Sequence, residues 1–232
     1  MLTLDGLHLR QGDFSLTAKL AFAPGLTAII GPSGGGKSTL LAALAGFLKP
    51  VAGAVLWDGV DLARKVPGDR PISMLFQDNN LFPHLSVAQN VGLGVDPRLK
   101  LDAPAWGRVS EMLASVDLAG FEDRLPAQLS GGQQSRVALA RVLVAARPVV
   151  LLDEPFAALG PALKAEMLAL VRATLVAKGQ TVLMVTHDPE DARRFADAVC
   201  VIADGVVYPP RVTDDAFGDP SAALRDYLGA VD

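Results

Sequence analysis

The chain contains Gly31-Pro32-Ser33-Gly34-Gly35-Gly36-Lys37-Ser38-Thr39, which matches the phosphate-loop pattern G-x-x-x-x-G-K-[ST] at every fixed position. It follows an apolar strand predicted over 26–30 and precedes a helix predicted over 37–48. Glycines let backbone N–H groups turn inward around an anion, and the positive end of the helix points at the same place. A plain Gly-rich turn is the alternative, which the strand–loop–helix order disfavours. We predict that this stretch binds a nucleoside triphosphate, with Lys37 on the β- and γ-phosphates and Ser38 on Mg²⁺.

A second pattern is Val149-Val150-Leu151-Leu152-Asp153-Glu154, an apolar run that ends in two carboxylates. The run predicts a buried parallel strand, and open α/β sheets bind their ligands at the carboxyl ends of such strands. A solvated acidic turn is the alternative, which the phosphate loop in the same chain disfavours. We predict that Asp153 holds Mg²⁺ and that Glu154 polarises the water that attacks the γ-phosphate.

A third pattern is Leu129-Ser130-Gly131-Gly132-Gln133, followed by an amphipathic helix predicted over 134–145. Ser130 suits an N-cap, and the two glycines allow a ligand to approach the helix start closely. The residues alone leave two interpretations open, a capped helix with a flexible entry or a second anion-binding helix start. A resemblance favours the second, because Leu-Ser-Gly-Gly-Gln is the signature sequence of ATP-binding cassette (ABC) ATPases and lies just upstream of the acidic strand in that family.

The resemblance to ABC ATPases covers nearly the whole chain, with five motifs in the order of the family. Gln77, after a strand predicted over 72–76, is similar to the glutamine that ligates Mg²⁺ in the family. His187, after a strand predicted over 181–186, is similar to the switch histidine that contacts the γ-phosphate. Caps on a strand end and on a helix start are the respective alternatives. The resemblance implies that Lys37, Glu154 and His187 are catalytic.

Two further stretches, 70–82 and 87–94, resemble the ATP-binding subunits of bacterial thiamine importers, and so do the Asn79-Asn80 pair and the short total length. This resemblance implies an ATPase, with ATP and Mg²⁺ as ligands, that couples hydrolysis to thiamine uptake. The alternative is an importer subunit for another small solute, such as a metal ion, an anion or a polyamine, because this kind of subunit does not touch the cargo. A non-transport ABC ATPase is a weaker alternative.

The resemblance also implies partners for the chain. Two copies are expected to face each other head to tail, so that each ATP lies between the phosphate loop of one copy and the signature stretch of the other. The segment 77–82 is expected to respond to a membrane permease, which a periplasmic solute-binding protein serves indirectly. The protein is therefore expected to lie peripherally on the cytoplasmic face of the inner membrane.

Composition limits the function further. The chain has 232 residues, half of them apolar, with a formal net charge of −4 and one cysteine, Cys200. A chain without a basic run is not expected to bind nucleic acid. No apolar run is long enough to span a bilayer, and the N-terminus lacks the pattern of a signal peptide. A lone cysteine forms no disulfide within the chain. These features are typical of a cytosolic protein.

The order of elements predicts an α/β fold, a P-loop NTPase of the ABC ATPase type with a mainly parallel core sheet. An antiparallel pair of strands is expected over 2–23, with its turn at Gln11-Gly12-Asp13. Within one domain, we expect the core over 1–77 and 148–210, an inserted helical subdomain over 78–147, and a short helical tail over 211–232. Helices are predicted over 161–178 and 189–195.

Two questions stay open at this stage. The family usually stacks an aromatic side chain on adenine from the first strand pair, where Phe14, His8 and Arg10 are candidates. The D-loop position, 157–160, ends in Gly160, where the family usually has aspartate. Local tolerance is one explanation, since Pro161 still suits the first position of the next helix. Looser coupling between the two nucleotide sites is the other.

Overall fold

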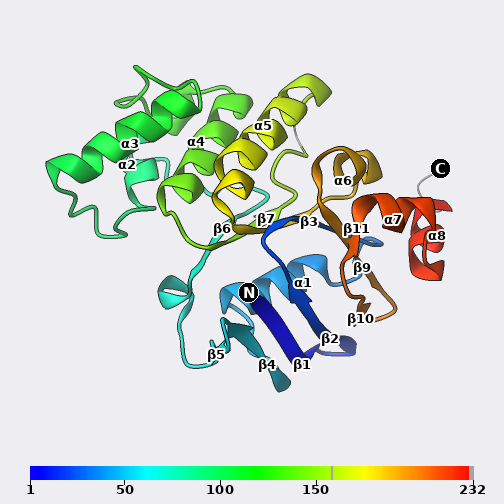
Figure 1. The fold of residues 1–232 in the computed structure, drawn as a ribbon. Coiled ribbons are helices and arrows are strands. Elements are labelled where there is room, and N and C mark those ends of the chain that lie inside the picture. Colours follow the sequence, from blue (N-terminus) through cyan, green and yellow to red (C-terminus); the bar gives the residue numbers. More distant parts are fainter. Residues whose placement is uncertain (158, 230–232) are drawn as a thin grey trace.

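The computed structural model describes residues 1–157 and 159–229, so Ala158 of the predicted D-loop and residues 230–232 of the predicted tail lie outside it. The described strands form one mixed sheet (Figure 1). Its order is β5 (Val60–Asp61), β4 (Ala52–Trp57), β1 (Leu2–Gln11), β2 (Phe14–Phe22), β10 (Val206–Val207), β9 (Ala198–Ala203), β3 (Gly25–Ile30), β8 (Thr181–Val185), β7 (Val149–Asp153) and β6 (Ile72–Leu75), while β11 (Arg211–Val212) pairs with β9.

The sheet has a parallel part and an antiparallel part, as predicted. Strands β9, β3, β8, β7 and β6 run parallel to one another, since helices connect most of them, while β10 and β11 pair antiparallel with β9. Strands β2, β1 and β4 pair antiparallel. Gln11 pairs with Phe14 across the predicted turn, where Gly12 has a φ of +59°, a left-handed conformation that glycine adopts without steric cost.

Both faces of the parallel strands are buried. Since successive side chains of a strand point to opposite faces of the sheet, neighbouring residues belong to different clusters. Leu151 of β7 packs in the same cluster as Leu40 and Leu44 of helix α1, between the parallel and the antiparallel strands. Leu152 belongs to a second cluster with Leu139 of helix α4 on the opposite face. The helices that carry these clusters are α1 (Lys37–Ala45), α4 (Gly131–Val144) and α5 (Pro161–Thr174).

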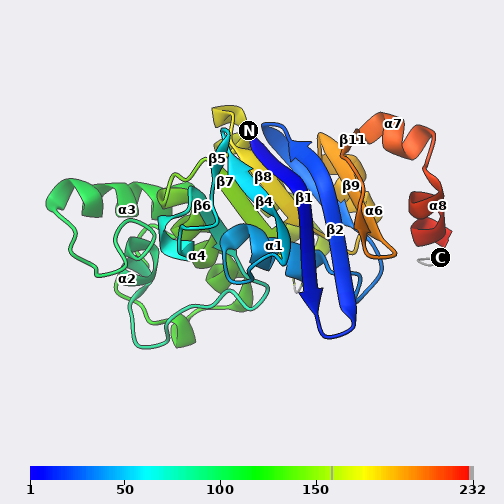
Figure 2. The same cartoon turned by 90° about the horizontal axis from the view of Figure 1, so that it is seen from below.

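The chain between β6 and β7 is helical, as the sequence predicted. Ser86 caps helix α2 in a capping box, in which its Oγ accepts from the Gln89 backbone N–H and the Gln89 side chain accepts from the Ser86 N–H. This region lies at one end of the molecule, and the tail helices lie at the other (Figures 1 and 2). The remaining helices are α2 (Val87–Gly92), α3 (Ala103–Ser115), α6 (Pro189–Phe195), α7 (Thr213–Gly218) and α8 (Ala222–Gly229), with 3₁₀ turns at Pro67–Asp69, Pro126–Gln128 and Val176–Lys178.

Several helix bounds differ from the prediction. Helix α1 ends at Ala45 rather than at 48, because Gly46 adopts a left-handed φ of +93° and its N–H closes the last turn onto Ala42. Helix α4 begins at Gly131 rather than at 134, because Ser130 and Gln133 form a capping box. Helix α5 ends at Thr174, and a 3₁₀ turn follows it up to Lys178.

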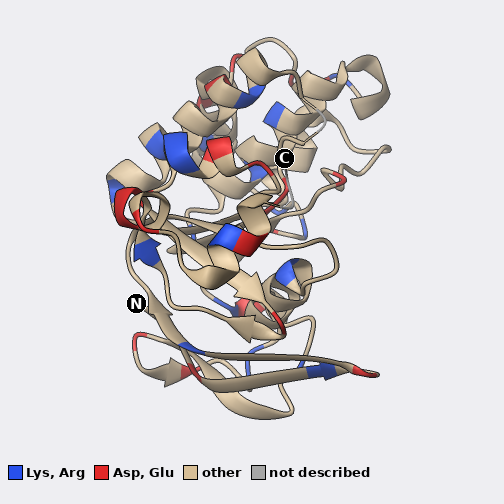
Figure 3. Ribbon diagram, turned by 90° about the vertical axis from the view of Figure 1, so that its right-hand side faces the viewer, with Lys and Arg blue, Asp and Glu red and all other residues tan. Residues whose placement is uncertain are grey.

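Charged residues lie mostly on helices, loops and strand ends, so most of the sheet is drawn without charge in Figure 3. Strands β7 and β8 together carry one charged residue, Asp153, at the carboxyl end of β7. Asp153 thus lies at the edge of the sheet formed by the carboxyl ends of the parallel strands, where α/β proteins bind their ligands. Among the described helices, none is both long and apolar enough to cross a membrane.

Candidate nucleotide-binding site

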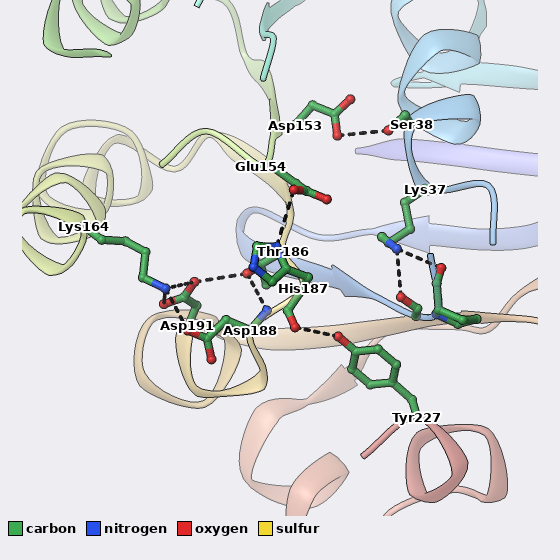
Figure 4. A network of polar contacts seen from close by, with 12 residues as sticks. Lys37, Ser38, Asp153, Glu154, Lys164, Thr186, His187, Asp188, Asp191 and Tyr227 are labelled. Atoms are coloured by element: carbon green, nitrogen blue, oxygen red, sulfur yellow. Dashed lines mark hydrogen bonds and ion pairs between the residues drawn. The ribbon is translucent and has the colours of Figure 1, made fainter. Parts of the chain in front are cut away.

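The carboxyl ends of β3, β7 and β8 meet at one edge of the sheet, because these strands are parallel neighbours. The phosphate loop follows β3, the two acids stand at the end of β7, and His187 follows β8. Figure 4 shows side chains from all three strand ends close together. The structure thus gathers four of the predicted site residues, Lys37, Asp153, Glu154 and His187, around the start of helix α1.

Glycines shape the phosphate loop. Gly31, Gly34 and Gly36 have φ values of +153°, +75° and +98°. A Cβ on Gly31 would lie 2.2 Å from the Ile202 carbonyl oxygen, and one on Gly36 would lie 2.5 Å from the Phe14 ring. Gly34 has open space around it, so only its backbone conformation requires glycine. These backbone conformations, which residues with a Cβ rarely adopt, curve the loop around a hollow.

Lys37 reaches back over the loop. Its Nζ donates to the carbonyl oxygens of Gly31 at 2.8 Å and of Pro32 at 2.9 Å. Burial lowers the pKa of Lys37, while the charges of Glu154 and Asp153 act to raise it. The ammonium is therefore desolvated and held by neutral acceptors. Charged phosphate oxygens form stronger hydrogen bonds than carbonyls do, so an anion in the hollow competes well for it.

Ser38 and Asp153 form a pair suited to Mg²⁺. The Ser38 Oγ donates to Asp153 Oδ1 at 3.2 Å. Burial raises the pKa of Asp153; the Ser38 hydrogen bond opposes this shift, and the Glu154 charge adds to it. A hydroxyl oxygen and a carboxylate oxygen are ligands that Mg²⁺ prefers, and a divalent cation would offset the cost of the buried charge. Gln77 lies in an exposed turn after β6, and within the described residues no hydrogen bond joins it to this pair.

Glu154 and His187 face each other. The His187 Nδ1 lies 3.4 Å from Glu154 Oε2, and the His187 side chain is 63% exposed. Glu154 has a φ of +46°, a conformation that L-residues rarely adopt. Such a conformation costs of order 1 kcal/mol, and strained backbone of this kind is enriched at active sites and ligand-binding loops. The carboxylate and the imidazole thus border the same space beside Lys37, where a water or a phosphate group would be reached by both.

A polar network supports the loop around His187, which we call the switch loop (residues 186–188). The Thr186 Oγ1 accepts from the Asp188 N–H and donates to Asp191 Oδ2, both at 3.1 Å. The Lys164 Nζ bonds to carboxylate oxygens of Asp188 at 2.7 Å and of Asp191 at 2.9 Å. Burial acts to lower the pKa of Lys164, but these hydrogen bonds raise it overall, and the Lys164 bond lowers the pKa of Asp188.

Sequence reasoning missed Lys164 and Asp191 as supports of this loop. The ion pairs join residues 24 and 27 positions apart, so no local pattern shows them. Only the helix start at Asp188-Pro189 could be predicted from the sequence, and Asp188 does cap α6 by accepting from the Glu190 N–H at 3.0 Å. The network fixes the backbone on both sides of His187.

The signature stretch Leu129–Gln133 stands apart from this site. Leu129 is buried, whereas Ser130 and Gly131 are exposed at the start of α4. The Ser130 Oγ accepts from the Gln133 N–H at 3.3 Å, which fixes the helix start. No hydrogen bond connects the stretch with the phosphate loop in the described part of the chain. The structure of one chain therefore does not join these two predicted parts.

The three residues that are candidates for stacking on adenine make different contacts. Phe14 is half-buried, and its ring packs against Gly36 of the phosphate loop. The His8 Nε2 instead lies 2.8 Å from the Ser15 hydroxyl, and the Arg10 Nε donates to the Gly12 carbonyl at 3.2 Å. Among the three, Phe14 is thus the candidate whose side chain contacts the phosphate loop.

Gly160 stands at the N-cap of α5 without a side chain to cap the helix. Its φ of −63° is open to any residue, and an added Cβ would meet nothing within 4 Å. The structure therefore gives no steric reason for glycine at this position. Ala158 of the predicted D-loop lies outside the described residues.

Known proteins resemble this chain over most of its length. The family described as "ABC transporter" matches residues 18–157. A protein of Cereibacter sphaeroides named "Thiamine import ATP-binding protein ThiQ" is 59% identical over 99% of this chain and 100% of its own length. A protein of the same name from Escherichia coli strain K12 is 50% identical over 84% of each chain.

A solved structure shares the fold. The dimeric post-hydrolysis state of the ATP-binding cassette MJ0796, bound to ADP and Pi, matches with a TM-score of 0.80 and 30% identity. The match covers 92% of this chain and 99% of that one. A second dimeric structure of MJ0796, described as a bacterial ABC transporter cassette, has a TM-score of 0.78. These likenesses confirm the predicted fold class.

Proposed function

Because this chain belongs to the ABC transporter family, we propose that it is the ATP-hydrolysing subunit of a bacterial importer and that it powers thiamine uptake through a membrane permease. The observation that carries the proposal is its high identity, over nearly its full length, to proteins named for thiamine import. The convergence of Lys37, Asp153, Glu154 and His187 at one sheet edge supports the ATPase part independently.

Lys37 and the N–H groups of the phosphate loop would bind the β- and γ-phosphates of ATP. Ser38 and Asp153 would hold Mg²⁺, since a hydroxyl and a carboxylate oxygen already lie 3.2 Å apart. Gln77 would complete the ligand set only if its exposed turn moved toward them. When bound, Mg²⁺ neutralises charge on the phosphates during phosphoryl transfer.

Glu154 would orient the attacking water and accept its proton. The water oxygen forms a bond to the γ-phosphorus while the bond from that phosphorus to the bridging oxygen breaks, which yields ADP and phosphate. Lys37 and His187 would stabilise charge on the transferring group. The 3.4 Å approach of His187 to Glu154 supports a shared role at one water.

We propose that Phe14 stacks on the adenine ring. Its half-buried ring already packs against the phosphate loop, whereas His8 and Arg10 bond to their own hairpin. Stacking on an aromatic face is worth about 1–3 kcal/mol per base.

We further propose that the working form is a head-to-tail homodimer on the cytoplasmic face of the membrane. Ser130 and Gly131 are exposed at the start of α4, and within the described residues no hydrogen bond joins them to the nucleotide site of their own chain. A second copy would bring that helix start to the γ-phosphate, related by a two-fold axis. The dimeric state of the solved cassettes supports this arrangement. The segment 77–82 would contact the permease, which receives thiamine from a solute-binding protein.

The test is thiamine uptake in cells that lack this chain, restored with the parent, with Lys37→Ala or with Lys19→Ala. Lys19 is an exposed lysine on β2 and serves as the matched control. Restoration by the parent and by Lys19→Ala, but not by Lys37→Ala, is expected. Normal thiamine uptake in the deletion strain, with no redundant importer present, would refute thiamine as the cargo; ATP hydrolysis by the purified chain would then still support the ATPase part of the proposal.

A further inference from the structure

The imidazole of His187 has little to hold it in place. Its side chain is 63% exposed, and its close polar neighbour is Glu154. The position of the ring therefore depends on the backbone of the switch loop. The Lys164 network holds that loop from the side of α5, as described above. The question is what holds it from the opposite side, toward the C-terminal tail.

Tyr227 of helix α8 makes that contact. Its hydroxyl donates to the backbone carbonyl oxygen of His187 at 2.9 Å, across 40 positions of sequence (Figure 4). Tyr227 is 8% exposed, so its hydroxyl is held in packed surroundings. The bond ends on the catalytic candidate itself and not on a neighbouring residue.

Helix α8 is firmly placed. Leu224 and Tyr227 pack in one cluster with Ala28 and Ile30 of β3 and with Ala192 of α6. Strand β3 leads into the phosphate loop, and α6 follows His187 directly. The helix that carries Tyr227 thus contacts the elements on which both halves of the site are built. Burial, together with the charges of Asp188 and Glu154, raises the pKa of Tyr227, so the hydroxyl keeps its proton and remains a donor.

A hollow of about 400 Å³ lies between this helix and the phosphate loop. Pro32, His187, Asp204, Asp226 and Tyr227 are among its lining residues. Packing is therefore incomplete on this side of the switch loop, and the Tyr227 hydroxyl bridges to the loop at the edge of the hollow. A directional hydrogen bond fixes the position of a backbone carbonyl where side-chain packing does not.

We propose that Tyr227 is a positioning residue for His187, and that the C-terminal helix thereby sets the reach of the imidazole toward the γ-phosphate. The inference rests on the proposed role of His187 in ATP hydrolysis. Displacements of about 1 Å at a positioned group are costly to phosphoryl transfer, which depends on alignment more than on covalent chemistry. The alternative is that Tyr227 serves only the core and its hydroxyl merely satisfies a buried donor.

The experiment compares Tyr227→Phe with Tyr208→Phe in the full-length chain. Tyr227→Phe keeps the buried ring and removes only the hydroxyl. Tyr208 is an exposed tyrosine, which makes it a matched control. The chain has three histidines, so labelling histidine with ¹³C at Cε1 yields a spectrum with one signal each for His8, His84 and His187. ATP hydrolysis is measured in parallel, with Lys37→Ala as the inactive reference, and thermal unfolding reports folding.

We expect Tyr227→Phe to move or broaden the His187 signal while those of His8 and His84 stay in place. We expect kcat to fall about tenfold with KM changed less than about twofold, since alignment rather than ATP binding is affected. Tyr208→Phe should match the parent. An unchanged His187 signal in folded Tyr227→Phe would overturn the inference whether or not the isolated chain hydrolyses ATP. Parent-like kcat in that variant, beside an inactive Lys37→Ala, would overturn it while leaving the ATPase proposal intact.

Discussion

The Ser38 Oγ donates a hydrogen bond to Asp153 Oδ1 at 3.2 Å, although 115 positions separate the two residues. Ser38 stands in the first turn of α1 and Asp153 at the end of β7. The contact exists because β3 and β7 flank β8 in parallel, so that their carboxyl ends share one edge. It places the two expected Mg²⁺ ligands side by side. The ionised carboxylate is needed for the proposed Mg²⁺ site, yet its burial disfavours the ionised form in the folded chain.

Asp153→Asn should lower ATP hydrolysis at least about a hundredfold, because the charged Mg²⁺ ligand is lost. The same variant should unfold at a higher temperature than the parent near pH 7. The reason is the raised pKa of Asp153, which means that the folded chain disfavours the ionised carboxyl. Asparagine avoids that cost and can still accept the Ser38 hydrogen bond.

The pH dependence checks this explanation. A raised folded pKa contributes stability that is complete below the ordinary value of 3.8 and is lost as pH rises through the folded pKa. The stability advantage of Asp153→Asn should therefore be largest near about pH 7 and should shrink toward about pH 4. Denaturant unfolding across that range measures it. An advantage that stays constant with pH would contradict the explanation.

Glu154→Gln should reduce ATP hydrolysis about 10²- to 10³-fold while ATP still binds, because the amide cannot accept the proton of the attacking water. The variant should accumulate as an ATP-bound dimer in size-exclusion chromatography with ATP and Mg²⁺. Glu166→Gln is the matched control, since Glu166 lies exposed on α5 and forms an ion pair with Arg136 of α4, away from the nucleotide site. Hydrolysis at the parent rate in Glu154→Gln would show that another group activates the water.

Phe14→Ala should weaken ATP binding about tenfold, as expected for the loss of one base-stacking contact. His8→Ala, on the adjacent strand of the same hairpin, should leave the affinity unchanged within about twofold. Titration with a fluorescent ATP analogue measures both. Because Phe14 also packs against the core, thermal unfolding must show that the variant is folded at the assay temperature. Weaker binding in His8→Ala alone would assign the stacking to the histidine.

Arg70→Ala should lower the free energy of unfolding by about 2–4 kcal/mol. Arg70 is 5% exposed, and its guanidinium donates to the carbonyl oxygens of Ala43 and Leu44, at the end of α1, and to that of Leu62. The variant removes all of these bonds; the carbonyl oxygens of Ala43 and Leu62 keep the N–H groups of Gly46 and Lys65 as donors, whereas that of Leu44 loses the guanidinium. Arg64→Ala, at an exposed arginine nearby, should change stability by less than about 0.5 kcal/mol. Equal losses in both variants, measured by urea unfolding, would rule out the capping role.

Gly160→Asp should fold normally, because a side chain at this position meets open space and an aspartate can cap α5. Its stability gain should be only a few tenths of a kcal/mol. If the missing carboxylate loosens the coupling between the two nucleotide sites, the variant should raise the Hill coefficient of ATP hydrolysis. Rates measured against ATP concentration decide this, and an unchanged Hill coefficient and rate would favour local tolerance of glycine.

Much of the fold followed from local patterns. Gly12 predicted its hairpin turn, and the apolar runs predicted the parallel strands. The N-cap predicted at Ser130 is confirmed, since Ser130 and Gln133 form a capping box at the start of α4. The end of α1 was missed although its signal was visible, because Gly46 is a left-handed helix end. The apolar pattern continues past Gly46, but the backbone hydrogen bonds of that glycine end the helix.

The phosphate loop, the acidic strand and the order of the motifs could all be predicted from the residues alone, because glycine conformation, strand burial and helix capping act between residues that are neighbours in the chain. Which distant side chains meet could be learned only from the folded structure. It placed Phe14 rather than His8 against the phosphate loop, and it brought Lys164 and Tyr227 to opposite sides of the switch loop. These contacts depend on the register of parallel strands and on the packing of helices against them, and neither leaves a pattern at short sequence separation.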